Sequence, residues 1–399
     1  MRLTLDELAH RLGLDTGRAR RLADTGAIDR APDGTYESGD VHRVRLLWAF
    51  EAAGVPMDAL VAAYRSGDLT FDFYDELHTD PGVGSRRAYA TFTERLGSGG
   101  RHVPGLFAAF GLAEPDPDTR LAIADEVLLA DLAETIEATG RPDLVTRAVR
   151  IAAEGARRSA EASLGAYAEA LAGFDTERET LPLAEFMDRR LRPWARLAHQ
   201  MAPLSAWLAA RHLTQAIDDY SVRETEAVLE RRGYTPLRDV EPPAIAFVDL
   251  SGFTRLTHEH GDEFGAQVAI RLGEVAASAV LVHGGHVVKL LGDGVLMRFS
   301  ALDPAVVGVL DLLDALPAAG LPTGHAGVVS GPIVVRDGDV FGRTVNLAAR
   351  LSDAASDGQL LIPAALAPEL RDLPVAITPA GARAIRGVGD LELATVTRA

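Results

Sequence analysis

The stretch that most constrains the fold of this chain is an apolar run ending on an aspartate, within residues 244–254. It reads Ala-Ile-Ala-Phe-Val-Asp-Leu-Ser-Gly-Phe-Thr. Five consecutive apolar residues, with β-branched and aromatic members among them, predict a strand that is buried on both faces. The strand delivers Asp249 to its end, where Ser251 and Gly252 allow a tight turn. Thr254 then starts a predicted helix, whose free N–H groups are suited to binding a phosphate.

Two more patterns follow in the same part of the chain. In residues 286–299, two apolar runs flank Gly-Asp-Gly, which predicts a β-hairpin with Asp293 at its tip. Residues 339–350 read Asp-Val-Phe-Gly-Arg-Thr-Val-Asn-Leu-Ala-Ala-Arg. Asn346 and Arg350 are four positions apart on the helix predicted there, so both point to one face.

Lys289, within the hairpin, is the only lysine in a chain whose lysines and arginines together number 40. A surface cation tolerates either side chain, whereas a tight pocket distinguishes the compact ammonium from the wide, planar guanidinium. The lysine therefore indicates a position where arginine does not fit. The alternative is chance in an arginine-biased composition.

Together the three patterns resemble the catalytic domain of the class III nucleotide cyclases, over roughly residues 242–396. The resemblance is carried by the ordered set: Asp249, then Lys-x-x-Gly-Asp ending at Asp293, then Asp-x-x-Gly-x-x-Val-Asn-x-x-x-Arg ending at Arg350. The alternation of strands and helices around a hairpin predicts an α+β fold, a ferredoxin-like sandwich in the C-terminal part.

The resemblance implies roles for four of these side chains. Asp249 and Asp293 would hold two Mg²⁺ or Mn²⁺ ions, which lower the pKa of the attacking hydroxyl and clamp the attacking and leaving oxygens. Asn346 would orient the ribose, and Arg350 would stabilise the charged transition state. Taken alone, either aspartate would be read as a turn cap, and the helix pair as an exposed polar face.

Base choice follows from hydrogen bonding. By resemblance Lys289 and Asp339 contact the base. Lys289 can only donate, and an ionised Asp339 can only accept. This pair fits adenine and mismatches guanine at both points, where each unpaired polar group costs ~1–3 kcal/mol. The expected substrate is ATP and the expected product cyclic AMP.

The triphosphate is expected at the turn after the first strand, in residues Leu250, Ser251, Gly252, Phe253 and Thr254. The better-known animal enzymes have an arginine after a Ser-Gly pair, where this chain has Pro332, and a lysine near the C-terminus, where it has Val388. Three arginines are candidate substitutes for the phosphate tail, with Arg386 the first choice beside Arg336 and Arg343.

In the family, the metal aspartates come from one catalytic domain, and the other four residues come from its partner. This chain carries all six once. The resemblance therefore implies a homodimer with two shared active sites, and a monomer could build none.

Residues 1–70 predict a helix-turn-helix module. A capping box at Thr4 and an apolar stripe start the first helix, and Gly13 begins the turn into the second. The order resembles the DNA-binding domain of MerR-type regulators, with Arg18, Arg20 and Arg21 on the recognition helix. Acidic residues match the arginines in number here and no stacking aromatics line the second helix, so DNA binding is not expected. The alternative is a module retained for packing or dimerisation.

Residues 71–234 predict a helical regulatory domain, with segments at 85–96, 119–138, 142–171, 183–192 and 205–232. Residues 235–243 form a proline-containing linker, and 244–399 form the catalytic domain. The helical half holds no paired carboxylates and is expected to control the enzyme, in response to pH or a small molecule. Trp194 and Trp207 could line an apolar ligand pocket, although core packing is the preferred interpretation.

Composition limits the remaining possibilities. A net charge of −17 and a pI near 5.1 argue against bulk affinity for nucleic acid or anionic lipid. The absence of cysteine and of a long apolar run favours a cytoplasmic protein without a membrane span. Two rival functions remain: a transcription regulator whose cyclase-like domain senses a nucleotide, and a guanylate cyclase, which would want an acidic residue in place of Lys289.

Overall fold

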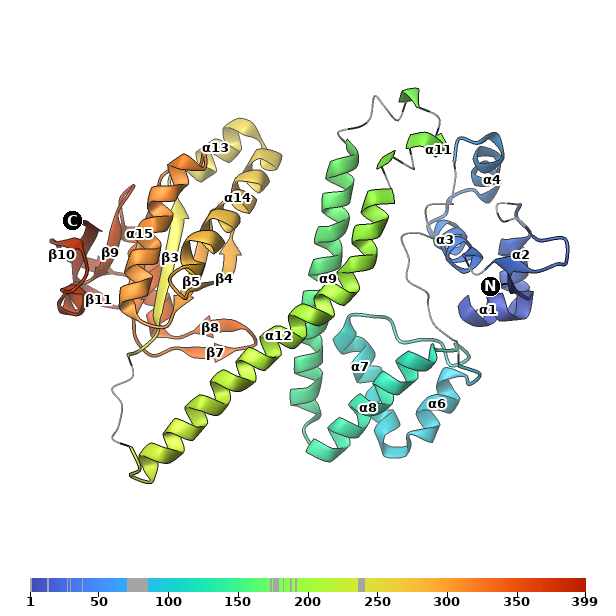
Figure 1. Cartoon of the computed structure of the whole chain (residues 1–399), viewed down its shortest axis with the longest axis horizontal. Helices are drawn as coiled ribbons and strands as arrows, with labels where there is room; N and C mark the ends of the chain where they lie inside the picture. The colour runs from blue at the N-terminus through green and yellow to red at the C-terminus, as the bar shows by residue number, and fades with distance from the viewer. Residues whose placement is uncertain are drawn as a thin grey trace. The chain divides into compact units, whose positions relative to one another are not determined.

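The structure is a computed structural model of the whole chain (Figure 1). It describes residues 2–69 apart from 13, 27, 29 and 38, residues 85–235 apart from 173, 175–178, 182, 187, 188 and 191, and residues 241–399. The chain divides into two compact units, Met1–Leu229 and Glu230–Ala399. The predicted boundary at residue 70 and most of the predicted linker lie outside the described residues.

The first part of the N-terminal unit is a small helical module with its own core. Its elements are β1 (Arg2–Leu3), α1 (Leu5–Leu12), α2 (Thr16–Ala23), β2 (Tyr36–Glu37), α3 (Asp40–Ala52) and α4 (Met57–Ser66). The predicted capping box is confirmed, because the Thr4 N–H donates to Glu7 Oε2 at 2.8 Å and the Glu7 N–H donates to Thr4 Oγ1 at 3.3 Å. Leu8, Leu22 and Leu47, from three different helices, are fully buried together.

Arg18 on α2 is engaged inside this module. Its guanidinium lies 5.1 Å from the centre of the Trp48 ring and 3.3 Å from Glu51 Oε2, both on α3. An arginine held against its own module is less available to a DNA phosphate.

The rest of the unit is helical. Its elements are α6 (Tyr89–Arg95), η1 (Gly97–His102), α7 (Val103–Phe110), α8 (Ile123–Thr139), α9 (Pro142–Ala172), α11 (Leu183–Phe186) and α12 (Arg192–Arg231). The break predicted after residue 96 is present, since α6 ends at Arg95 and residues 97–100 lie in a 3-10 turn that leads directly into α7. The prediction was wrong for the last helix, which starts at Arg192 instead of residue 205 and runs through Pro203.

The two tryptophans of this region have different surroundings. Trp194 packs edge-to-face on Tyr167, with ring centroids 6.1 Å apart. Trp207 is 56% exposed, with the Arg211 guanidinium 5.3 Å from its ring. Core packing, the preferred interpretation of Trp207, is therefore wrong for this chain.

The C-terminal unit is built on a seven-stranded sheet with the order β10-β11-β9-β6-β3-β5-β4. Its strands are β3 (Ala244–Leu250), β4 (His286–Leu291), β5 (Gly294–Phe299), β6 (Gly324–Ser330), β9 (Leu360–Pro363), β10 (Val375–Ile385) and β11 (Gly389–Arg398), with β7 (Val334–Arg336) and β8 (Asp339–Phe341) as a separate hairpin. The helices are α13 (Phe253–His260), α14 (Asp262–Leu281), α15 (Leu302–Ala318) and α16 (Arg343–Ala354), followed by the 3-10 segment η3 (Ala364–Leu370).

The first four strands have the ferredoxin-like arrangement that was predicted. In chain order the elements run strand, helices, strand, strand, helix, strand, and in space the antiparallel order is β6-β3-β5-β4. β3 is therefore central. It is flanked by β5 and β6 and nearly completely buried, as its apolar run predicted.

Helices cover both faces of this sheet. Ala246 and Val248 of β3 face a core with Leu272 of α14 and Val309 of α15, all fully buried. Ile245 of β3 faces the opposite core, which contains Ala348 and Leu351 of α16. The alternation of strand side chains thus sends Asp249, two positions after Phe247, to the α16 side of the sheet.

Among the described helices, length and composition would let one, α14, cross a membrane. Leu272, Ala276 and Val280 on one side of it are buried in the core against β3 and α15. That packing accounts for one side of the helix, whereas Ile270 and Leu281 on it are 61% and 73% exposed.

Candidate functional site

Asp249 and Asp293 meet where β3 and the hairpin end. Asp249 pairs with Gly294 in the β3–β5 register, and the Leu250 N–H donates to the Asp293 carbonyl oxygen at 3.0 Å. Gly294 leaves room for the carboxylate, because a Cβ there would lie 2.9 Å from Asp249 Oδ1. The predicted hairpin is confirmed, and it brings the two aspartates to one end of the sheet.

The electrostatics of this end favour a cation. Burial raises the pKa of Asp249 above its ordinary value, and the nearby charge of Asp293 raises it further, with a smaller contribution from Asp353. His325 opposes this shift: its Nε2 lies 3.8 Å from Asp249 Oδ2. Two carboxylates that repel each other are stabilised by a shared divalent ion, so the donor set fits Mg²⁺ or Mn²⁺. In the described part of the chain, no three His, Asp or Glu side chains are gathered closely enough to form a complete metal centre.

Lys289 and Asp339 form a second pair. Lys289 lies on β4, next to a register shift in its pairing with β5, and Asp339 begins β8. The Lys289 Nζ donates to Asp339 Oδ2 at 2.5 Å, while Asp339 Oδ1 accepts the N–H of Val340 at 2.8 Å. The hydrogen bond from Lys289 is the main reason why the pKa of Asp339 is lowered. Both side chains remain partly exposed, so a base has access to them.

Asn346 and Arg350 lie on α16, as predicted, with Asn346 exposed and Arg350 half-buried. Gly387 packs against the Arg350 guanidinium, since a Cβ on it would lie 3.0 Å from Arg350 Nη1. The exposed Arg386 is the neighbour of this glycine. No hydrogen bond or ion pair connects Asn346 or Arg350 to the aspartate pair in the parts of the chain that the structure describes.

The turn after β3 presents only part of its backbone to a ligand. The Leu250 N–H is taken by Asp293, and the Ser251 N–H donates to the Thr323 carbonyl oxygen at 2.8 Å. Gly252, with φ of 73°, caps α13, and the first N–H groups of a helix have no partner within it. The available donors in this described turn are therefore those of Gly252, Phe253, Thr254 and Arg255.

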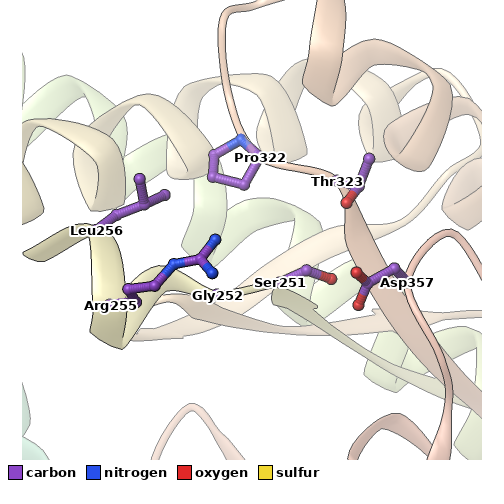
Figure 2. Close-up of a pocket in the computed structure, with 7 residues that line it drawn as sticks. All are labelled: Ser251, Gly252, Arg255, Leu256, Pro322, Thr323 and Asp357. Carbon is purple, nitrogen blue, oxygen red and sulfur yellow. The ribbon is translucent and has the colours of Figure 1, made fainter.

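A cavity of about 520 Å³ adjoins this turn (Figure 2). Arg255 and Asp357 reach toward it from opposite sides, with Ser251 between them, and Pro322 and Thr323 lie above. The Ser251 hydroxyl is buried and has no hydrogen-bond partner in this described region. The turn therefore borders a cavity that is lined by the Arg255 guanidinium and by the Ser251 hydroxyl, which has no hydrogen-bond partner among the described residues.

Sequence reasoning missed three residues of this site: Gly294, His325 and Arg255. Gly294 was visible as part of Gly-Asp-Gly, but its contact with Asp249 depends on the register of β3 and β5. His325 becomes a neighbour of Asp249 only because β6 pairs with β3. Arg255 follows the predicted phosphate loop directly and could have been included on its charge alone.

Known proteins resemble this chain over most of its length. It is 30% identical over 311 residues to an adenylate cyclase of Streptomyces coelicolor, and this alignment covers 73% of this chain and 75% of that protein. It is 31% identical over 300 residues to the pH-sensitive adenylate cyclase MT1302 of Mycobacterium tuberculosis, with 73% and 72% covered.

Solved structures and family models add little to these matches. The adenylyl cyclase CyaB from P. aeruginosa matches 40% of this chain and 95% of its own, with 21% identity and a TM-score of 0.36. No family model matches. The two relatives are aligned over nearly three quarters of each chain, and they show that this enzyme belongs to the class III adenylate cyclase family.

Proposed function

We propose that the protein converts ATP to 3′,5′-cyclic AMP and pyrophosphate. The observation that carries the proposal is the meeting of Asp249 and Asp293 at one end of the sheet, with mutual repulsion that a divalent ion relieves. The Lys289–Asp339 pair supports adenine as the base, because it offers one donor and one acceptor.

In this reaction the ribose 3′ oxygen forms a bond to the α-phosphorus, and the bond from that phosphorus to the pyrophosphate oxygen breaks. Two Mg²⁺ or Mn²⁺ ions held by Asp249 and Asp293 would make the 3′-hydroxyl more acidic and neutralise charge on the phosphates. Asn346 orients the ribose, and Arg350 donates to phosphate oxygens as their charge increases.

The phosphate tail is held by the backbone at the start of α13 and by Arg386. The N–H groups of Gly252, Phe253 and Thr254 face a position that favours negative charge. Leu250 and Ser251 shape the turn, because their own N–H groups are already used. Arg386 is supported by its place beside Gly387, which touches the Arg350 guanidinium.

The active unit is a homodimer whose sites are shared between the two chains. Support comes from the lateral edge of the sheet that β4 forms. Large apolar side chains are exposed there and on the β7–β8 hairpin: Leu290 44%, Leu291 47%, Val335 52% and Phe341 51%. An exposed apolar edge beside Lys289 and Asp339 is suited to cover by a second copy.

Residues 1–234 regulate this activity, as a helix-turn-helix module followed by a helical domain. Of the three arginines on α2, Arg18 contacts Trp48 and Glu51 of the same module, whereas Arg20 and Arg21 are exposed. Because acidic residues also match the arginines of the module in number, a role in packing or dimerisation is preferred over DNA binding. The pH-sensitive relative makes pH a reasonable signal to test, beside apolar ligands.

The proposal is tested by measuring cyclic AMP formed from ATP with Mg²⁺ or Mn²⁺. The full chain is compared with a truncated chain beginning at Glu241 and with Asp293→Ala as the inactive control. Cyclic AMP from the wild type and none from the control is the expected result. A wild type that makes no cyclic AMP with either ion, across a range of pH, would refute the proposed activity.

A further inference from the structure

His325 and Asp249 face each other on neighbouring strands. The β3–β6 register pairs Asp249 directly with His325, and directly opposed residues of an antiparallel pair project to the same face. The side chains meet there, with His325 Nε2 3.8 Å from Asp249 Oδ2. The imidazole is mostly buried, at 15% exposed, whereas the carboxylate is 40% exposed and open to a ligand.

The imidazole is held in one orientation by α16. Its Nδ1 lies 2.9 Å from the Ser352 carbonyl oxygen, and a carbonyl can only accept, so Nδ1 carries the proton. The Ser352 hydroxyl donates in turn to the His325 carbonyl oxygen at 3.3 Å. In the neutral ring, Nε2 therefore has a free lone pair, directed to the side of the ring where Asp249 lies.

We propose that His325 Nε2 is a nitrogen ligand of the divalent ion that Asp249 binds. The proposal rests on the proposed function, because it takes Asp249 as a metal ligand. Metal bonds of ~2.1 Å to each atom span up to roughly 4.2 Å, so one ion can bridge atoms separated by the distance observed here. A ligating histidine commonly donates its other N–H to a backbone carbonyl, as His325 does to Ser352.

A nitrogen ligand changes which ion the site prefers. Mg²⁺ binds oxygen almost exclusively in proteins, whereas imidazole suits first-row transition ions. The Asp249 carboxylate alone would serve either class of ion. With His325 as a second protein ligand, Mn²⁺ should be held more tightly than Mg²⁺.

The test measures Mn²⁺ binding to the full chain by electron paramagnetic resonance, with pulsed detection of nitrogen coupling to the bound ion. The variants are His325→Ala and His325→Gln. The control is His283→Ala, which removes an imidazole bonded to Asp311 on a different side of the fold. Circular dichroism verifies that each variant is folded.

Nitrogen coupling is expected in the wild type and in His283→Ala, and not in either His325 variant. The Mn²⁺ dissociation constant should rise ~10-fold or more on loss of His325, while Mg²⁺ affinity, measured by competition, changes much less. Coupling that persists in His325→Ala would overturn the proposal, and so would a wild type with bound Mn²⁺ but no coupling.

Asp249→Asn separates this inference from the proposed function. If Asp249→Asn weakens Mn²⁺ binding and the His325 variants do not, His325 is not a ligand but the aspartate site stands. If Asp249→Asn also leaves Mn²⁺ binding unchanged, the metal assignment underlying the proposed function fails.

Discussion

The ammonium of Lys289 and the carboxylate of Asp339 are joined by a 2.5 Å hydrogen bond, so the two side chains predicted to contact the base satisfy each other. An adenine that enters between them replaces one charge-assisted bond with two bonds to the base. The pair therefore discriminates against guanine, because a base with the opposite donor and acceptor pattern breaks the hydrogen bond between Lys289 and Asp339 and leaves both groups unpaired.

Lys289→Glu should lower kcat/KM for ATP by ~10-fold or more, because the donor is lost and two carboxylates then repel. The preference for ATP over GTP should fall at the same time. Steady-state kinetics with both nucleotides checks this, with Arg371→Glu, an exposed charge reversal elsewhere in the unit, as control. A wild type that turns over GTP as readily as ATP contradicts the assignment.

Lys289→Arg tests the meaning of the only lysine in the chain. The guanidinium keeps the positive charge but is wider and planar, so it should not reproduce the single short bond to Asp339. We expect activity well below wild type with unchanged folding. Wild-type kinetics in Lys289→Arg would mean that the lysine is a chance feature of composition.

Neutralising Asp249 is expected to have opposite effects on the stability and on the activity of the protein. The folded-state pKa of Asp249 is raised, by burial first and then by Asp293, so ionising Asp249 opposes folding. Without metal, its contribution to stability is therefore greatest at low pH and is lost as pH rises through the folded pKa. At neutral pH, metal-free Asp249→Asn should melt at a higher temperature than the wild type, while its activity falls ~100-fold or more.

Melting curves of the metal-free proteins at several pH values check this expectation. The stabilisation in Asp249→Asn should diminish as the pH is lowered, because the wild-type carboxyl becomes neutral as well. Divalent ions should raise the melting temperature of the wild type only. A variant less stable than the wild type at every pH would show that the carboxylate has a structural role.

Gly294→Ala should impair the metal site without removing a ligand. The added Cβ would lie 2.9 Å from Asp249 Oδ1, closer than such contacts allow, so the carboxylate must move. We expect weaker Mn²⁺ binding and a loss of activity in a folded protein. Gly155→Ala, where the Cβ meets open space in a helix, is the matched control and should behave as wild type.

How far the sequence predicts this structure depends on whether the deciding contacts are local. β3, the hairpin at Asp293 and the helix with Asn346 and Arg350 were predicted, because each has a local pattern of apolar residues and glycines. β10 was missed, since Pro379 and Gly381 interrupt it and fall at a bulge in its pairing with β11.

The site shows the same limit. The proximity of Asp249 and Asp293 could be predicted, because it depends on one strand and on the hairpin that pairs with it, and both have a local sequence pattern. The contact of Asp249 with His325 needs the sheet order, in which β6 returns beside β3. That order is a property of the whole unit and has no signal in residues 324–330. The prediction of core packing for Trp207 failed for a related reason, because the sequence of a long helix does not reveal whether another element covers an aromatic residue on it.

Removal of the N-terminal half is expected to change how the activity is regulated and not which reaction is catalysed. A truncated chain beginning at Glu241 should keep the preference for ATP but change its rate or its response to pH. Full-length and truncated proteins are compared across pH, with and without apolar ligands. Identical kinetics under all these conditions would exclude regulation by residues 1–234. A gel-shift with the full chain is expected to give no DNA complex.

Shared sites predict that two inactive chains restore each other. Asp249→Ala removes a metal ligand and Asn346→Ala removes a ribose contact, so each homodimer carries a lesion in both of its sites. In a mixed dimer with two-fold symmetric contacts, one site collects both lesions and the other collects neither. Mixing the two variants should therefore recover activity, up to about a quarter of wild type when exchange is random, since half the dimers are mixed and each has one intact site. Mixing Asp249→Ala with Asp293→Ala is the control and should recover none, because both aspartates of one chain serve the same site and each site of the mixed dimer then lacks one of them. An inactive first mixture, with subunit exchange verified by differently labelled chains, would rule out the shared-site dimer.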